Sequence, residues 1–187
     1  MGASPAVRLA VVAALICAAA GCGGGAVAPD GPAAGWTTFR DDAHGLTVRF
    51  PSSWHRATRS LTPYLAGPKE ILSLGTFRLR RGDARSCAQM PMGAVETARS
   101  RDVFLSVQEL AEHGNGPSRR HPFALGRPVA APGLECVGTS PRWRSYWLRF
   151  DDAGRGFYLL ALVGRDAPPA RVHELHEVLD DLRFERR

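Results

Sequence analysis

Residues 156–163 read GFYLLALV, a run that is apolar on both of the faces that an extended strand would present. Side chains alternate between the two faces of a strand, so a strand with one solvated face shows polar residues at every second position. A strand without such positions must be central and covered on both sides. The rest of the chain therefore has to supply neighbouring strands and at least one layer of helices over this run.

A partner strand comes directly before this run. Residues 143–150, WRSYWLRF, are rich in aromatic residues, and the short connection DDAGR predicts a tight hairpin between the two strands. Further strands are predicted from alternation and composition, together with a short helix after Pro91. The predicted strands cover residues 46–50, 70–80, 102–110 and 133–139, with a short extended piece from Trp54 in a hairpin with 46–50, and the helix covers 91–99.

The last part of the chain has the period of a helix. After Pro168-Pro169, the apolar residues Val172, Leu175, Leu179 and Leu182 recur at helical spacing, and RFER then predicts a short edge strand. Residues 113–133 are dense in glycine and proline and predict a long surface loop. The pattern as a whole predicts an α+β domain in which an antiparallel β-sheet is packed with helices.

The N-terminus indicates export. Arg8 precedes the apolar run from Leu9 to Ala20, which is too short to cross a bilayer core that needs roughly 20 helical residues. The residues Ala19-Ala20-Gly21-Cys22 resemble the lipobox of bacterial lipoproteins, although Ala19 stands where the usual residue is Leu. The resemblance implies cleavage before Cys22 and a diacylglyceryl group, with its palmitate-type chains, on the Cys22 thiol. The alternative is an ordinary secretory signal cut after Ala20, which would leave the protein secreted.

These features predict three regions. Residues 1–21 form a lipoprotein signal peptide, residues 22–35 form a tether rich in Gly, Ala and Pro, and residues 36–187 form a single domain. Cys87 and Cys136 remain in that domain, and an extracytoplasmic compartment permits a disulfide bond between them. The bond would close a loop of about 50 residues, which is worth roughly 4 kcal/mol in the chain-entropy model.

The ends of the domain resemble a known family. GLTVRFPSSWHRA, residues 45–57, resembles the opening hairpin of PsbP-like proteins, and VLDDLRF, residues 178–184, resembles their closing helix and strand. That family includes the extrinsic PsbP subunits of photosystem II, Ran-binding nuclear import factors of the same fold, and small actinobacterial lipoproteins. The resemblance implies a PsbP-like α/β/α sandwich and a non-enzymatic binding or accessory role. It assigns no role to any individual residue.

The net charge of +6 does not predict a nucleic-acid partner. The chain has 23 arginines but one lysine, and acidic residues are interleaved with the arginines, which indicates the codon bias of a high-GC genome. A basic surface would still attract anionic lipid or cell-wall polymer.

The sequence contains few chemical motifs. His173 and Glu177 in HELHE could hold a metal ion at i, i+4 spacing, but H-E-x-x-H would need a histidine at position 177, and a polar helix face explains them better. No cofactor motif is found. Trp143 and Trp147 should share one strand face, with Tyr146 on the other. These aromatic residues belong either to the core or to a binding face.

We therefore expect a lipid-anchored protein on the extracytoplasmic face of the cell membrane that binds an envelope protein, a lipid, another small ligand or a wall component without catalysing a reaction. The alternative is an envelope hydrolase whose site is assembled from distant loops.

Overall fold

The computed structural model describes residues 35–65, 67–82, 88–111, 116–128 and 142–186, all of which belong to the unit Pro32–Arg187. The predicted signal peptide, the disulfide between Cys87 and Cys136, the lipidation site Cys22 and the predicted strand 133–139 lie outside these residues. Within the described residues, no helix is both long and apolar enough to span a bilayer.

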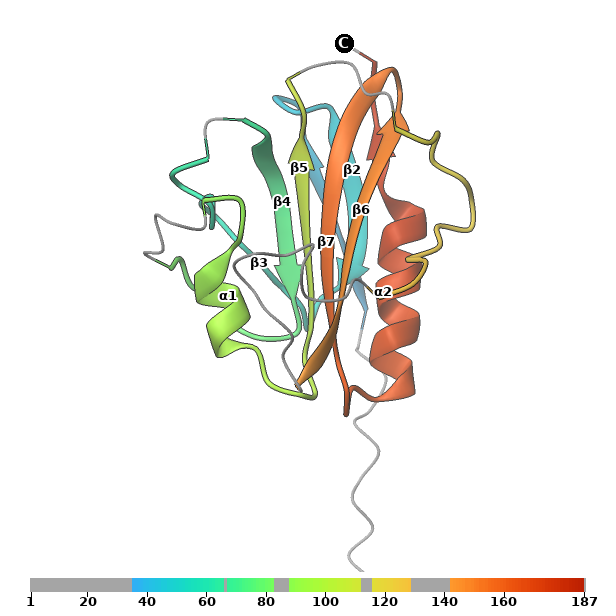
Figure 1. Ribbon diagram of the computed structural model, residues 1–187. Helices are drawn as coiled ribbons and strands as arrows, with labels where there is room; N and C mark the ends of the chain where they lie inside the picture. The colour runs from blue at the N-terminus through green and yellow to red at the C-terminus, as the bar shows by residue number, and fades with distance from the viewer. Residues whose placement is uncertain (1–34, 66, 83–87, 112–115, 129–141, 187) are drawn as a thin grey trace, which may run out of the picture. The chain divides into compact units, whose positions relative to one another are not determined.

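The larger of two antiparallel sheets is built around the strand that the apolar run predicts. Strand β7 (Arg155–Gly164) lies between β5 (Val103–Glu109) and β6 (Trp143–Asp152), as Figure 1 shows. Nearly all of β7 is buried, which confirms the prediction of a central strand covered on both faces. The full order of this sheet is β3 (His55–Arg56), β4 (Lys69–Gly75), β5, β7 and β6.

The hairpin between β6 and β7 is also confirmed. Its turn consists of Ala153 and Gly154, which both have positive φ angles, 53° and 78°. Two positive φ angles are characteristic of the type I′ turn, whose twist matches that of the flanking strands. The pairing of Asp152 with Arg155 then fixes the register over the whole length of both strands.

The smaller sheet differs from the expectation. Its order is β1 (Trp36–Asp41), β2 (Leu46–Pro51) and β8 (Arg183–Phe184). The prediction that the extended piece after Trp54 pairs back on β2 is wrong, because β3 pairs with β4 in the larger sheet and β2 pairs with β1. The turn from Pro51 to Trp54 therefore carries the chain from one sheet to the other. The predicted short edge strand at the end of the chain is confirmed by β8.

Strand β4 is shorter than predicted. It ends at Gly75 instead of residue 80, and its register with β5 shifts between Glu70 and Leu72. This irregularity allows two successive residues, Ile71 and Leu72, to be buried in the same core. A Cβ atom at Gly75 would lie 3.0 Å from the side chain of Leu79, so the residues after the strand pack closely against its end.

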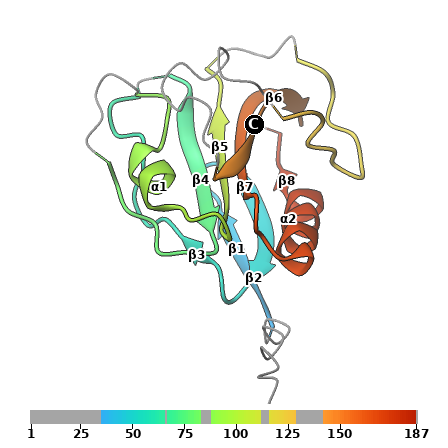
Figure 2. The ribbon, with the colours of Figure 1, turned by 60° about the horizontal axis from the view of Figure 1, so that its bottom comes forward.

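Two helices cover opposite faces of the larger sheet (Figures 1 and 2). Helix α2 (Pro169–Asp181) begins with proline in its first turn, where a missing N–H costs nothing. It lies with the smaller sheet on one face, packs on β2 and β5, and buries Leu175, Val178 and Leu179 in the core there. Helix α1 (Met92–Thr97) lies on the other face and buries Ala94 and Val95.

The protein is therefore an α+β domain with mostly antiparallel sheets, as predicted, and the second sheet is an addition to that prediction. One core lies between the larger sheet and the layer formed by α2 and the smaller sheet. A second, smaller core lies under α1.

Candidate functional site

The segment 116–128 has no helix or strand, as the glycine and proline content predicts, but part of it is held against the end of β6. Ser118 forms an isolated parallel bridge with Asp151. The main-chain N–H of Arg119 donates to the carbonyl oxygen of Asp151 (2.8 Å), and the N–H of Asp151 donates to that of Pro117 (3.0 Å). The segment therefore continues the sheet for a short distance beyond β6.

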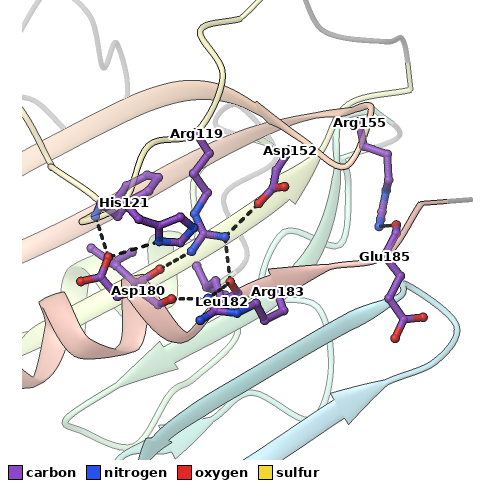
Figure 3. Close-up of polar contacts among 10 residues, drawn as sticks. Arg119, His121, Asp152, Arg155, Asp180, Leu182, Arg183 and Glu185 are labelled. Atoms are coloured by element: carbon purple, nitrogen blue, oxygen red, sulfur yellow. Dashed lines mark hydrogen bonds and ion pairs between the residues drawn. The ribbon is translucent and has the colours of Figure 1, made fainter.

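The side chain of Arg119 links this segment to the end of helix α2 through hydrogen bonds (Figure 3). Its side chain is only 2% exposed. Nη2 donates to the carbonyl oxygen of Leu179 (2.6 Å), and Nη1 donates to that of Leu182 (2.8 Å). The last carbonyl groups of a helix lack partners within the helix, and a cation there is favoured by the helix dipole. Arg119 thus supplies a C-terminal cap from a distant part of the chain.

The guanidinium group of Arg119 forms an ion pair with Asp152. Nη1 lies 3.0 Å from Oδ2 of Asp152 at the end of β6. Burial lowers the pKa of the Arg119 guanidinium, while the hydrogen bond and the charge of Asp152 oppose that shift. Arginine nevertheless keeps its proton in proteins at neutral pH.

A second attachment lies a few residues further along the segment. The N–H of Phe123 donates to Oδ1 of Asp180 on α2 (2.6 Å), and Nδ1 of His121 lies 3.7 Å from the same oxygen. The ring of Phe123 packs edge-on against that of Phe150, with centroids 5.3 Å apart. Arg119 and Phe123 therefore fix the segment between the helix end and β6.

An open groove of about 470 Å³ lies between this segment and β6. We call it the arginine groove, and its lining consists of residues 117–120, 122–124 and 148–150. All of its charged lining residues are arginines, namely Arg119, Arg120 and Arg149. The rest of the lining is largely apolar and includes Phe123 and Phe150. A volume between about 300 and 1,000 Å³ is typical of small-molecule sites.

The side chain of Arg119 also contains a buried donor that lacks an acceptor within the described part of the chain. Nε of Arg119 is inaccessible to solvent and has no hydrogen-bond partner within the described part of the chain. Buried polar groups in folded proteins almost always have a partner, so an unpaired one requires an explanation.

The aromatic residues singled out from the sequence do not form one surface. Trp143 and Trp147 share one face of β6, and Tyr146 lies on the other, as the strand period predicts. Trp143 is buried in the core under α1, whereas Tyr146 belongs to the core under α2. Trp147 is half-buried and packs on Tyr158, with ring centroids 5.2 Å apart. A binding face made of all three residues is therefore incompatible with their placement on two faces.

Among the residues that the structure describes, histidine–carboxylate contacts occur at three separate places. In the turn after β1, Nδ1 of His44 lies 2.7 Å from Oδ2 of Asp41, and the N–H of the same histidine donates to the other oxygen of Asp41. His173 and Glu177 lie 3.6 Å apart on the exposed face of α2. The third is the contact of His121 with Asp180. Among the described residues no group of three or more potential metal ligands is found.

A smaller open hollow of about 230 Å³ lies near β3 and includes Arg59, Leu79 and Arg81. No side chain that lines this hollow has a buried, unpaired polar atom within the described part of the chain.

The arginine groove was missed by the sequence analysis, which treated residues 113–133 as surface loop. One signal was available. Phe123 and Leu125 are apolar residues in a loop of polar residues, glycine and proline, and both are buried. Such residues indicate a loop that packs on the domain.

Comparison with known proteins gives no further information on the site. No family model, curated protein or solved structure matches the chain.

Proposed function

We propose that this protein is a lipoprotein anchored to the extracytoplasmic face of the cell membrane through Cys22, and that its domain is a non-catalytic binding module. The observation that supports the binding role is the arginine groove, in which a firmly attached segment forms one wall and β6 forms the other. The groove offers cations and apolar side chains that can contact a ligand. An envelope protein, which the sequence leaves open as a partner, would then bind the domain in its ligand-bound state.

The anchor is tested by labelling cells that produce the full chain with an alkyne analogue of palmitate. The wild-type protein should carry the label and should sediment with membranes. Cys22→Ala should lose both properties, whereas Cys17→Ala, a matched change inside the apolar run, should keep the label. Unlabelled wild-type protein in the culture medium would instead establish the secreted alternative.

The binding role is tested by native mass spectrometry of the full chain purified from its own membranes in lipid nanodiscs. We expect a small molecule to be retained by the wild-type protein. Ala124→Trp, which fills the arginine groove, should lose it, and Ala170→Trp, an exposed change at the start of α2, should retain it. Absence of any bound molecule from the wild-type protein, or its retention by Ala124→Trp, would contradict the binding role.

We also propose that the α+β domain is a PsbP-like α/β/α sandwich. This proposal is supported by the path of β2 into Pro51 and Trp54, and by helix α2 leading directly into β8. An experimental structure superposed on PsbP-like proteins tests it. A different strand order in those proteins would contradict it.

A further inference from the structure

Three chain segments meet at one end of the domain. The main-chain N–H of Asp166 donates to the carbonyl oxygen of Ser100 (2.8 Å), and that of Arg165 donates to the carbonyl oxygen of Arg142 (2.9 Å). Gly164 lies so close to Ser100 that a Cβ atom would have no room there. We call residues 98–102, 142–144 and 164–168 the basal face. Figure 1 shows this face at the lower end of the domain, where β7 ends and α2 begins.

Strand β1 begins at the same end of the domain. Trp36, its first residue, pairs with Pro51, and Arg171 near the start of α2 donates to Oγ of Ser53 in the turn that follows (3.1 Å). The proposed lipid on Cys22 precedes β1 by the predicted tether, residues 22–35. A flexible chain of that length has an r.m.s. end-to-end distance of roughly 20 Å. The proposed anchor therefore keeps the basal face close to the bilayer.

The basal face is positively charged. It contains two aspartates, and one of them, Asp102, accepts hydrogen bonds from the N–H of Arg99 and the hydroxyl group of Thr76. Against these stand five arginines, all exposed, namely Arg99, Arg101, Arg142, Arg144 and Arg165. Within the described part of the chain, ion pairs are absent from four of them, Arg99, Arg101, Arg144 and Arg165. The positive charge of this face is therefore available to an outside partner.

The opposite end of the domain differs in charge. It contains the β1–β2 turn, the β6–β7 hairpin and the residues after β8, which Arg155 joins through His44 and Glu185. Arginines at this end are paired with carboxylates: Arg40 with Asp42 and Glu185, Arg119 with Asp152, and Arg155 with Glu109. The end that faces the anchor therefore offers unpaired cations, and the far end offers cations that carboxylates already neutralise.

We propose that the basal face docks the domain on the anionic head groups of the membrane that holds its lipid anchor. Guanidinium groups bind lipid phosphates through charge-assisted hydrogen bonds, and each basic residue near an anionic surface strengthens binding about fivefold. This inference rests on the proposed anchor at Cys22 and adds the orientation of the anchored domain. The arginine groove, at the other end of β6, then lies away from the bilayer.

The test uses the full, lipid-carrying chain in nanodiscs of anionic phosphatidylglycerol or of zwitterionic phosphatidylcholine. The reagent p-hydroxyphenylglyoxal modifies accessible guanidinium groups, and mass spectrometry of the peptides gives a rate for each arginine. Arg99, Arg101 and Arg165 should react about tenfold more slowly on phosphatidylglycerol. Arg186, exposed after β8, should react equally on both lipids. Salt near 1 M, where the Debye length is about 3 Å, should abolish the difference.

Variants with a matched control test the residues. Arg101→Gln should weaken docking about fivefold and raise the rates of Arg99 and Arg165 on phosphatidylglycerol about threefold. Arg101→Lys keeps the charge and should retain most of the protection. Arg186→Gln removes the same charge from the far end and should leave these rates unchanged. Equal effects of Arg101→Gln and Arg186→Gln would show that net charge acts without the basal face, and would overturn the inference.

The remaining outcomes separate docking from the anchor. The mass of the purified protein shows first whether it carries the lipid, and a chain without lipid contradicts both proposals. A lipid-carrying chain whose basal arginines react equally on the two lipids overturns docking alone and leaves the anchor and the groove untouched. Protection by soluble poly(glycerol phosphate) but not by phosphatidylglycerol would assign the basal face to a wall polymer, and would also overturn docking on the membrane.

Discussion

Arg155 on β7 donates a hydrogen bond from Nε to Oε1 of Glu109 on β5, at 2.7 Å. The remaining nitrogens of the same guanidinium group reach beyond the larger sheet. Nη2 donates to the carbonyl oxygen of His44, in the β1–β2 turn, and Nη1 donates to that of Glu185, just after β8. One nearly buried side chain therefore joins the two sheets at one end of the core (Figure 3).

Replacement of Arg155 by Met should destabilise the domain strongly. The change keeps much of the volume but leaves Glu109 without this partner and two main-chain oxygens without their donor. Breaking a buried ion pair costs roughly 3–5 kcal/mol, and the partial exposure of Glu109 places the expected loss at the lower end. Urea denaturation of the wild type and the variant measures the difference in the free energy of unfolding.

The matched control is Arg144→Met, an exposed arginine on the adjacent strand, whose effect should stay within about 0.5 kcal/mol. Arg155→Lys keeps the charge but lacks the planar fork, so it should fall between the two. Equal losses of unfolding free energy for Arg144→Met and Arg155→Met would show that the contacts of Arg155 between the two sheets do not stabilise the domain.

Asp180→Ala should loosen the segment that forms the arginine groove. The change removes the acceptor of the Phe123 N–H but leaves the attachments of Arg119 in place. Hydrogen exchange of the full chain should show faster exchange in residues 120–124. Asp181→Ala is a close control, because Asp181 bonds to Arg49 on the other side of the helix. Faster exchange of the segment in both variants would mean that general fraying of α2, and not the Asp180 contact, controls it.

Ala153→Asn should stabilise the protein. Ala153 has a φ angle of 53°, which is costly for alanine and well tolerated by asparagine. Asn-Gly is also the preferred sequence of a type I′ hairpin turn. We expect a gain of about 0.5–1 kcal/mol, or roughly 1–4 °C in Tm, by calorimetry. Gly154→Ala should lower Tm, and a lower Tm for Ala153→Asn would rule out this account of the turn.

The stability of the domain should depend on Asp41 at low pH. Burial raises the pKa of Asp41, but the hydrogen bonds that it accepts from the side chain and main chain of His44 outweigh burial, so its pKa lies below the ordinary value. A carboxyl group whose pKa is lower in the folded state stabilises the fold at pH values above its unfolded-state pKa, about 3.9. This contribution disappears as the pH falls through the folded-state pKa.

Asp41→Asn should therefore lose stability relative to the wild type at pH 5–7, and the difference should shrink as the pH falls below about 4. Urea denaturation across this pH range measures it. A difference that stays constant down to the lowest pH would show that ionisation of Asp41 does not contribute.

The elements that the sequence predicted correctly have patterns that local packing determines. The run 156–163 is apolar at every core position, and Leu175 and Leu179 recur at the helical period, so β7 and α2 could be recognised without knowing their partners. Strand β1 was not predicted, because none of its residues is fully buried and it shows no apolar face. Its place is determined by pairing with β2.

The incorrect hairpin and the unrecognised groove share one cause. The pairing of His55 with Gly75 and the bond from Arg119 to Leu179 both join residues far apart in the chain. The sequence near Arg119 contains no sign of the helix end that it caps. Loop residues that serve a distant element are therefore visible only in the folded protein.

The position of β2 has a consequence for synthesis of the chain. Its residues Leu46, Val48 and Phe50 are buried against α2, and Arg49 bonds to Asp181, which lies 132 positions later. The strand therefore emerges from the ribosome long before the helix that covers it. Until α2 is made, an apolar strand stays without its cover, and such segments bind chaperones or aggregate. The domain can complete its fold only after nearly all of it has been synthesised.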